Sequence, residues 1–135
     1  MGIDREAVIR TYLAEADGQL GQIEEGLRAL EARPDDAGRL ETICRAVHTL
    51  KGTSAMLEFH RVAEFARAVE EVLERLGAGT LGARDGLVPL LLSAVDALRE
   101  FVPEAAAGVR EFRPEHEALL RRLAAVGAEE TPGPT

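Results

Sequence analysis

Apolar residues recur every three or four positions along most of the chain, and this spacing constrains the fold more than any other feature. It places them on one side of an α-helix, which makes about 3.6 residues per turn. The first apolar stripe comprises Leu13, Ala16, Leu20, Ile23, Leu27 and Leu30. Similar stripes follow within residues 40–57, 62–76, 87–101 and 119–126. No segment has the pattern of a strand, so the sequence predicts an all-α fold.

Capping residues and a turn divide the first three stripes. Asp4 is the candidate N-cap of the first helix, because its carboxylate can accept a hydrogen bond from a backbone N–H of the first turn. Asp35 or Asp36 is expected to cap the second helix, which is predicted from about residue 36 to residue 58. Phe59-His60 is predicted to form the turn before the third helix.

Glycines and prolines divide the rest of the chain. Residues 77–82 are predicted to form a loop because they are rich in glycine. Pro103 is expected to stop the fourth helix, Pro114 to open the fifth, and Gly127 to cap its C-terminus. Residues 128–135 are predicted to begin a flexible linker, which suggests that the chain is a piece of a longer protein.

The length and composition are typical of one helical domain, assigned to residues 1–127. A chain of 135 residues is long enough for a single hydrophobic core. Aromatic residues make up only 4% of it and tryptophan is absent, so the core is predicted to be aliphatic. The predicted architecture is an antiparallel four-helix bundle with a fifth helix, at the C-terminus, packed alongside.

Charge and cysteine content exclude several classes of function. The net charge of −8 argues against nucleic acid or an anionic membrane as a partner, since both require clustered Lys or Arg. A single cysteine, Cys44, cannot form an intramolecular disulfide, and this fits a reducing, cytoplasmic location. No apolar run approaches the roughly 20 residues that span a bilayer. The three scattered histidines do not have the spacing of a zinc site.

Residues 48–54, His-Thr-Leu-Lys-Gly-Thr-Ser, carry the strongest functional signal. On a helix, Lys51 and Gly52 lie beside His48, which is at the edge of the apolar stripe and therefore expected to be partly exposed. A neutral imidazole nitrogen is a competent nucleophile. Lys51 would offset the charge of a phosphoryl group, and Gly52 would leave room for the active site of a partner. The pattern favours a histidine that accepts and donates a phosphoryl group.

This stretch resembles the H-x-x-K-G-x-[SA] motif of histidine phosphotransfer (HPt) domains. It is most similar to the N-terminal phosphotransfer domain of CheA-type chemotaxis histidine kinases. The resemblance extends over roughly residues 4 to 126, including Tyr12–Asp17 and Leu90–Leu98.

The resemblance also implies roles for two residues of the third helix. A glutamate there hydrogen-bonds the phosphorylatable histidine in the family, and the matching position is Glu70. Arg67 stands where the family often has a second histidine. Arg67 would either assist the phosphoryl group or pair with Glu71 or Glu64 at helical spacing.

The resemblance implies a phosphoacceptor substrate domain and not an enzyme. The ATP-binding core of a histidine kinase, on the same polypeptide, would phosphorylate His48 at Nε2 while Glu70 holds Nδ1. The phosphoryl group would then pass to an aspartate on a response-regulator receiver domain, with chemotaxis as the family's common output. ATP and Mg²⁺ would serve the kinase core and Mg²⁺ the receiver, so no cofactor or metal is expected in this domain. The domain by itself is expected to be monomeric.

Two other functions remain open from the sequence alone. One is a relay HPt domain that passes phosphate between receiver domains of a hybrid phosphorelay. The other is a non-catalytic helical adaptor that retains a vestigial histidine. The sequence beyond the linker would distinguish a relay domain from a kinase domain, by lacking or containing a kinase core. Substitution of His48 would test the adaptor.

Several other reactive side chains are interpreted as structural. His60 is expected in a turn and His116 exposed in the first turn of its helix. Cys44, one helical turn before His48, is expected to pack against the core. Ser54 is expected inward, its hydroxyl bonded to the carbonyl of Leu50 one turn earlier.

Overall fold

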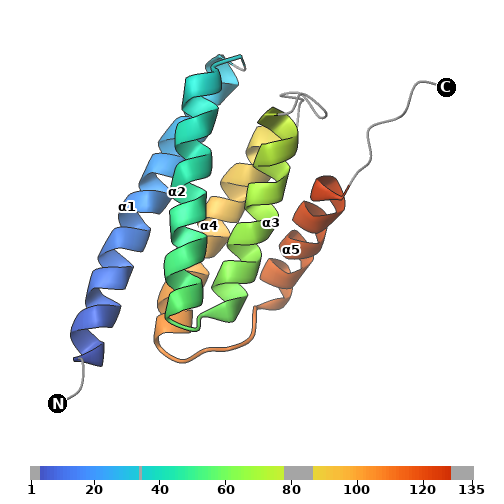
Figure 1. The fold of residues 1–135 in the computed structure, drawn as a ribbon. Coiled ribbons are helices and arrows are strands. Elements are labelled where there is room, and N and C mark those ends of the chain that lie inside the picture. Colours follow the sequence, from blue (N-terminus) through green and yellow to red (C-terminus); the bar gives the residue numbers. More distant parts are fainter. Residues whose placement is uncertain (1–3, 34, 78–86, 129–135) are drawn as a thin grey trace.

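The structure, a computed structural model, describes residues 4–33, 35–77 and 87–128. These residues form five α-helices and no strand, which confirms the predicted all-α class (Figure 1). The helices are α1 (Arg5–Ala32), α2 (Ala37–Met56), α3 (His60–Gly77), α4 (Leu87–Ala106) and α5 (Pro114–Gly127). Most of the predicted loop at residues 77–82 and nearly all of the predicted linker lie outside the described residues.

Helices α1 to α4 form a closed antiparallel bundle. Each packs against the next in sequence, and α4 returns to pack against α1. The shorter α5 lies outside this ring, where it packs against α3 and α4 (Figure 1). The four-helix bundle with an added C-terminal helix is therefore confirmed.

The core is mainly aliphatic, as predicted, and a small aromatic cluster supplements it at the end of the bundle near α5. Phe112 lies in the connection between α4 and α5, and its ring centroid is 4.3 Å from that of Phe101 and 5.7 Å from that of Phe65. The guanidinium of Arg61 lies 4.2 Å above the Phe112 ring. These contacts attach the α4–α5 connection to α3 and α4. The sequence pattern did not predict this role for Phe112.

Two aspartates cap the first two helices. The side chain of Asp4 accepts a hydrogen bond from the backbone N–H of Ala7 at 3.3 Å. That of Asp36 accepts one from the N–H of Arg39 at 3.0 Å. Each satisfies an N–H group that has no partner within its helix. The predicted N-caps are confirmed, with Asp36 as the cap of α2.

The α2–α3 turn lies slightly earlier than predicted, because α2 ends at Met56 and His60 is already the first residue of α3. The N–H of Phe59 donates to the carbonyl of Ser54 at 2.8 Å, and the N–H of Glu58 to that of Ala55 at 3.0 Å. This is the Schellman arrangement that ends many helices. Glu58 has φ +66°, a left-handed conformation that usually favours glycine.

Pro103 does not stop α4, and that expectation is wrong: the helix continues to Ala106. The N–H of Ala107 donates to the carbonyl of Pro103 at 3.0 Å, so the last turn closes around the proline. Pro103 lies on the exposed face, where water can solvate the carbonyl that its missing N–H leaves unpaired. Pro114 opens α5 as predicted, but α5 includes Gly127 and its C-cap is Ala128.

Helices α1 and α2 approach each other closely at Gly26. This glycine is buried on α1 and faces Ile43 of α2. A Cβ atom at position 26 would lie 2.5 Å from Cγ1 and 2.9 Å from Cδ1 of Ile43, which is fully buried. A Cβ at Gly21, by contrast, would meet nothing within 4 Å. Only Gly26 is therefore required by packing of the two helices.

We expect Gly26→Ala to destabilise the fold by about 1–3 kcal/mol, because the β-branched Ile43 cannot move aside without repacking. The matched variant Gly21→Ala should stabilise it by about 0.4–1 kcal/mol, since alanine costs less conformational entropy in an open helical position. Urea unfolding of the two variants measures both effects. Equal changes in the free energy of unfolding would contradict the close approach.

Candidate functional site

His48 and Glu70 meet where α2 and α3 pack side by side. Nδ1 of His48 lies 2.9 Å from Oε2 of Glu70. An ionised carboxylate can only accept hydrogen bonds, so Nδ1 carries the donated proton. The lone pair of Nε2 is then free. Since the His48 side chain is 70% exposed, a partner can reach this nitrogen from solvent.

Lys51 contacts the other oxygen of the same carboxylate. Its Nζ lies 2.6 Å from Oε1 of Glu70, and its side chain is largely buried, with 28% exposed. Glu70 is therefore held from both sides by residues one turn apart on α2. Helical spacing placed Lys51 beside His48, but its bond to Glu70 depends on the packing of α3 and was not predicted. Such charge-assisted hydrogen bonds fix the carboxylate and, through it, the imidazole.

The environment of Glu70 keeps it ionised. Partial burial raises the pKa of Glu70, but hydrogen bonds and charge from Lys51 and His48 outweigh this effect. Its pKa therefore lies below the ordinary value. At neutral pH the carboxylate is negative and accepts the Nδ1 proton of His48, which selects one imidazole tautomer.

Gly52 follows Lys51 on the exposed side of α2. A Cβ atom there would meet nothing within 4 Å, so packing inside this chain does not require glycine. Glycine within a helix costs about 1 kcal/mol relative to alanine. Its presence beside His48 is consistent with close approach by a partner, and that role stays a prediction.

Arg67 lies on α3 in an exposed ion pair. Its Nε is 3.3 Å from Oε1 of Glu71, and 72% of its side chain is exposed. This is the helical pairing that the sequence analysis offered as one of two alternatives. Assistance to a phosphoryl group stays a hypothesis.

His116 was expected to be exposed, and this expectation is wrong. It is only 2% exposed because it faces α4, where its ring lies 6.3 Å from that of Phe101. The first-turn position on α5 suggested exposure, but docking of α5 onto α3 and α4 covers it. His60 is exposed at the start of α3.

Ser54 is buried as expected, but its hydrogen bond differs from the expectation. Its hydroxyl lies 2.7 Å from the hydroxyl of Tyr12 on α1, rather than bonding to the carbonyl of Leu50. Tyr12 is buried, while Leu13, which the apolar stripe placed inward, is only partly buried. A buried tyrosine hydroxyl usually finds such a partner, so these two residues attach α1 to the helix of His48.

Cys44 is half-buried and poorly suited to act as a nucleophile. Burial raises the pKa of the Cys44 thiol, and the nearby carboxylates of Glu74, Glu70 and Glu41 raise it further. The thiolate is the reactive form, and it is scarce when the pKa is high. The geometry thus favours His48 as the reactive group of this surface.

The described residues contain neither a candidate metal site nor a membrane-spanning helix. In residues 4–33, 35–77 and 87–128, no three His, Cys, Asp or Glu side chains are grouped so that they could hold a metal ion. None of the helices in these ranges has the length and hydrophobicity needed to cross a membrane.

The sequence model of the Hpt domain matches residues 7–101, which include His48, Lys51, Gly52 and Glu70. This chain belongs to the Hpt domain family. In this Hpt domain the largely exposed imidazole of His48 is held through one ring nitrogen by a carboxylate on the neighbouring helix.

Several characterised proteins resemble this Hpt domain. Chemotaxis protein CheA of Borreliella burgdorferi is 31% identical over 102 residues, which are 76% of this chain and 12% of that protein. Sensor histidine kinase CheAY of Helicobacter pylori is 27% identical over 96 residues, which are 71% of this chain and 12% of that protein. The chain thus spans about an eighth of the length of these relatives.

A solved structure resembles the whole fold. The phosphorylated P1 domain of CheA3 from R. sphaeroides, crystallised in complex with CheY6, superimposes with a TM-score of 0.80 at 29% identity. The match covers 90% of this chain and 96% of that one. The likeness therefore includes nearly all of the P1 domain, not only the region around the histidine.

We expect Glu70→Gln to lower the free energy of unfolding by about 1 kcal/mol at pH 6, through loss of charge-assisted hydrogen bonds. The effect should shrink at pH 3. The pKa of Glu70 is lower in the folded state than in the unfolded state. The stability that the ionised carboxylate provides is therefore fully present above the unfolded pKa of about 4.3, and it is lost as the pH falls through the pKa of the folded state. Urea unfolding at both pH values measures it.

The control for this prediction is Glu74→Gln, which alters an exposed carboxylate of the same helix. We expect it to change the free energy of unfolding little at either pH. If Glu70→Gln cost the same stability at pH 3 as at pH 6, the ionised Glu70 carboxylate would not be the stabilising group.

Proposed function

We propose that this Hpt domain is the phosphotransfer domain of a CheA-type histidine kinase and that His48 is its phosphoacceptor. The observation that carries the proposal is the hydrogen bond between Nδ1 of His48 and the ionised Glu70, which leaves Nε2 as the nitrogen of this exposed side chain that a partner can use. The likeness to CheA proteins and to the phosphorylated P1 domain of CheA3 supports it.

In the phosphorylation step, the lone pair of Nε2 attacks the γ-phosphorus of ATP bound to the kinase core. A P–N bond forms, and the bond from the γ-phosphorus to the bridging oxygen breaks, so ADP leaves with that electron pair. Because Nδ1 keeps its proton, the phosphorylated ring of His48 carries a positive charge. The carboxylate of Glu70 stabilises this charge, in the same hydrogen bond that orients the free ring.

In the second step, a carboxylate oxygen of an aspartate on a response-regulator receiver attacks the phosphorus. The P–N bond breaks and its electron pair returns to Nε2, which restores the neutral imidazole of His48. Neutral imidazole is a good leaving group from the cationic phospho-imidazole, because no proton must be supplied to it. Mg²⁺ of the receiver would offset the charge of the phosphoryl oxygens.

The partners follow from these two steps. A histidine kinase core, on the same polypeptide, would donate the phosphoryl group, as the name of the Helicobacter pylori relative suggests. A receiver would accept it, as the complex of CheA3 P1 with CheY6 suggests. The receiver would dock over α2 and α3 around Gly52, in the cytoplasm, and chemotaxis is the output that the CheA relatives support.

Substitution of His48 tests the proposal. A CheA-type kinase core from the same organism, supplied with labelled ATP, should label the wild-type domain and His60→Gln but not His48→Gln. The label should be acid-labile and alkali-stable, as expected of phosphohistidine. Label on His48→Gln would refute the site, and absence of label from every variant would refute the acceptor function.

We expect Gly52→Gln to slow phosphoryl transfer to the receiver by about tenfold or more, because bulk beside His48 displaces the partner from the reactive geometry. Its helical content and thermal stability should stay at or above those of the wild type, since the position is open. The control Ala124→Gln adds the same side chain to the exposed face of α5 and should transfer normally. Full transfer by Gly52→Gln would refute the docking surface.

A further inference from the structure

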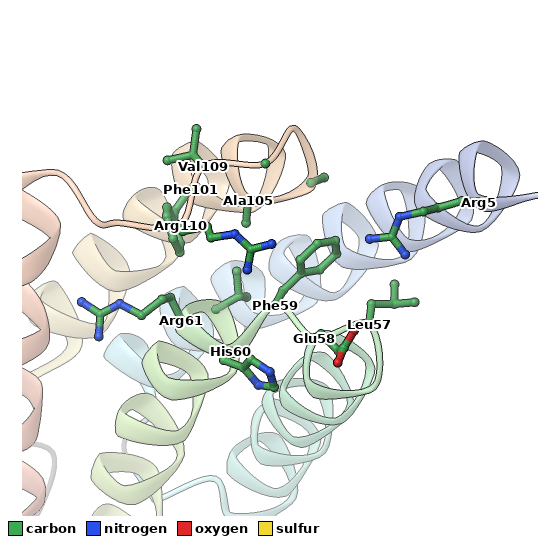
Figure 2. A pocket seen from close by; sticks show the side chains of 13 residues that line it. Arg5, Leu57, Glu58, Phe59, His60, Arg61, Phe101, Ala105, Val109 and Arg110 are labelled. Carbon is green, nitrogen blue, oxygen red and sulfur yellow. The ribbon is translucent and has the colours of Figure 1, made fainter.

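A cavity of about 480 Å³ lies at the end of the bundle where the α2–α3 turn faces the end of α4. Figure 2 shows its lining side chains, which come from α1, the α2–α3 turn, the start of α3, and α4 with the residues that follow it. His48, Lys51, Gly52 and Glu70 are not among its lining residues. The volume lies within the range of about 300–1,000 Å³ that is usual for ligand sites.

The walls of the cavity are rigid. The α2–α3 turn and the end of α4 both close with Schellman hydrogen bonds, the second joining the N–H of Val109 to the carbonyl of Glu104 at 2.9 Å. Gly108 and Glu58 both have positive φ in these turns. A non-glycine residue in this conformation stores strain of about 1–2 kcal/mol, and such strain often occurs at functional sites.

The cavity is positively charged, although the chain has a net charge of −8. Three arginines line it against one acidic residue, Glu58. Arg61 is paired, with Glu64 at 2.6 Å and Glu117 at 2.7 Å. Arg5 and Arg110 have no hydrogen-bond or ion-pair partner among the described residues.

The two unpaired arginines line the cavity on opposite sides of Phe59. In Figure 2 the guanidinium groups of Arg5 and Arg110 extend toward Phe59 from opposite sides, whereas that of Arg61 is directed away toward α5. Glu58 and His60 lie together on the other side of Phe59 in the same view. Anionic groups on either side of Phe59 would therefore each face a guanidinium group.

The floor of the cavity is apolar and continues onto the surface. Phe59, Val62 and Phe101 contribute to the lining. Val109, also in the lining, is 45% exposed, and Met56, beside the lining residue Leu57, is 79% exposed. These two are the exposed large hydrophobic residues of the described part of the chain, and both lie at this end of the bundle.

We propose that this cavity is a docking site for an acidic segment of a partner protein that carries an aromatic anchor side chain. The anchor would insert beside Phe59, and flanking carboxylates would pair with Arg5 and Arg110. A small anion would pair with the arginines but leave Met56 and the exposed part of Val109 in contact with water, whereas a polypeptide segment is long enough to reach both. The cavity carries unpaired positive charge, although this chain as a whole is acidic. Charge complementarity therefore favours an acidic segment as the occupant.

The test uses the whole domain, labelled with ¹⁵N and titrated with the capped peptide acetyl-Glu-Asp-Phe-Asp-Glu-amide. We expect saturable changes in the amide signals of Phe59, His60, Val109 and Arg110, and weaker binding at higher salt. The double variant Arg5→Glu with Arg110→Glu should weaken binding by about tenfold or more. A matched double variant, Arg121→Glu with Arg122→Glu on the exposed face of α5, should bind as the wild type does.

Three results would overturn the proposal. Two altered peptides test the occupant: one has alanine in place of phenylalanine, and the other has lysines in place of the acidic residues. If either altered peptide bound as tightly as the original, an acidic segment with an aromatic anchor would be excluded. Binding that survives the double reversal at Arg5 and Arg110 would exclude the site. Phenylacetate binding as tightly as the peptide would indicate a small carboxylate instead. His48→Gln should leave peptide binding unchanged, so the result is independent of the phosphotransfer proposal.

Discussion

The carboxylate of Glu70 is the interaction on which the candidate site depends. One oxygen holds Nδ1 of His48 and the other holds Nζ of Lys51. The first bond sets the tautomer and aims Nε2 at solvent, and the second keeps the carboxylate ionised and fixed. His48 and Lys51 both lie on α2, and both are held by a residue of α3. The orientation of the imidazole therefore depends on how the two helices pack, and not on the sequence motif by itself.

The rest of the bundle holds these two helices in place. Gly26 lets α1 approach α2 closely, and the hydrogen bond between Tyr12 and Ser54 joins the same pair nearer the end of α2. Helix α4 closes the ring, and α5 covers the outer side of α3 and α4. The buried hydroxyls of Tyr12 and Ser54 satisfy each other between α1 and α2, and His48 and Gly52 lie on the exposed side of α2.

The sequence predicted the features that depend on local pattern. Helical periodicity located all five helices, aspartates marked two N-termini, and the spacing around His48 indicated the candidate phosphoacceptor. Some errors are local and concern where helices end, as at Pro103 and Gly127, but most concern contacts between distant segments. Burial of His116, the anchoring of Phe112 and the bond between Tyr12 and Ser54 depend on how helices dock, which periodicity does not specify. The pairing of Lys51 with Glu70 likewise requires the register of α3 against α2.

The position of the phosphoryl group on the imidazole ring tests the central claim most directly. The domain would be labelled with ¹⁵N-histidine, phosphorylated by a CheA-type kinase core and examined by ³¹P and ¹⁵N NMR. Because Glu70 holds Nδ1 of His48, the phosphorus should be bonded to Nε2 of that residue, with the Nδ1 proton retained. A phosphorus–Nδ1 bond, or phosphorylation of another histidine, would contradict the account.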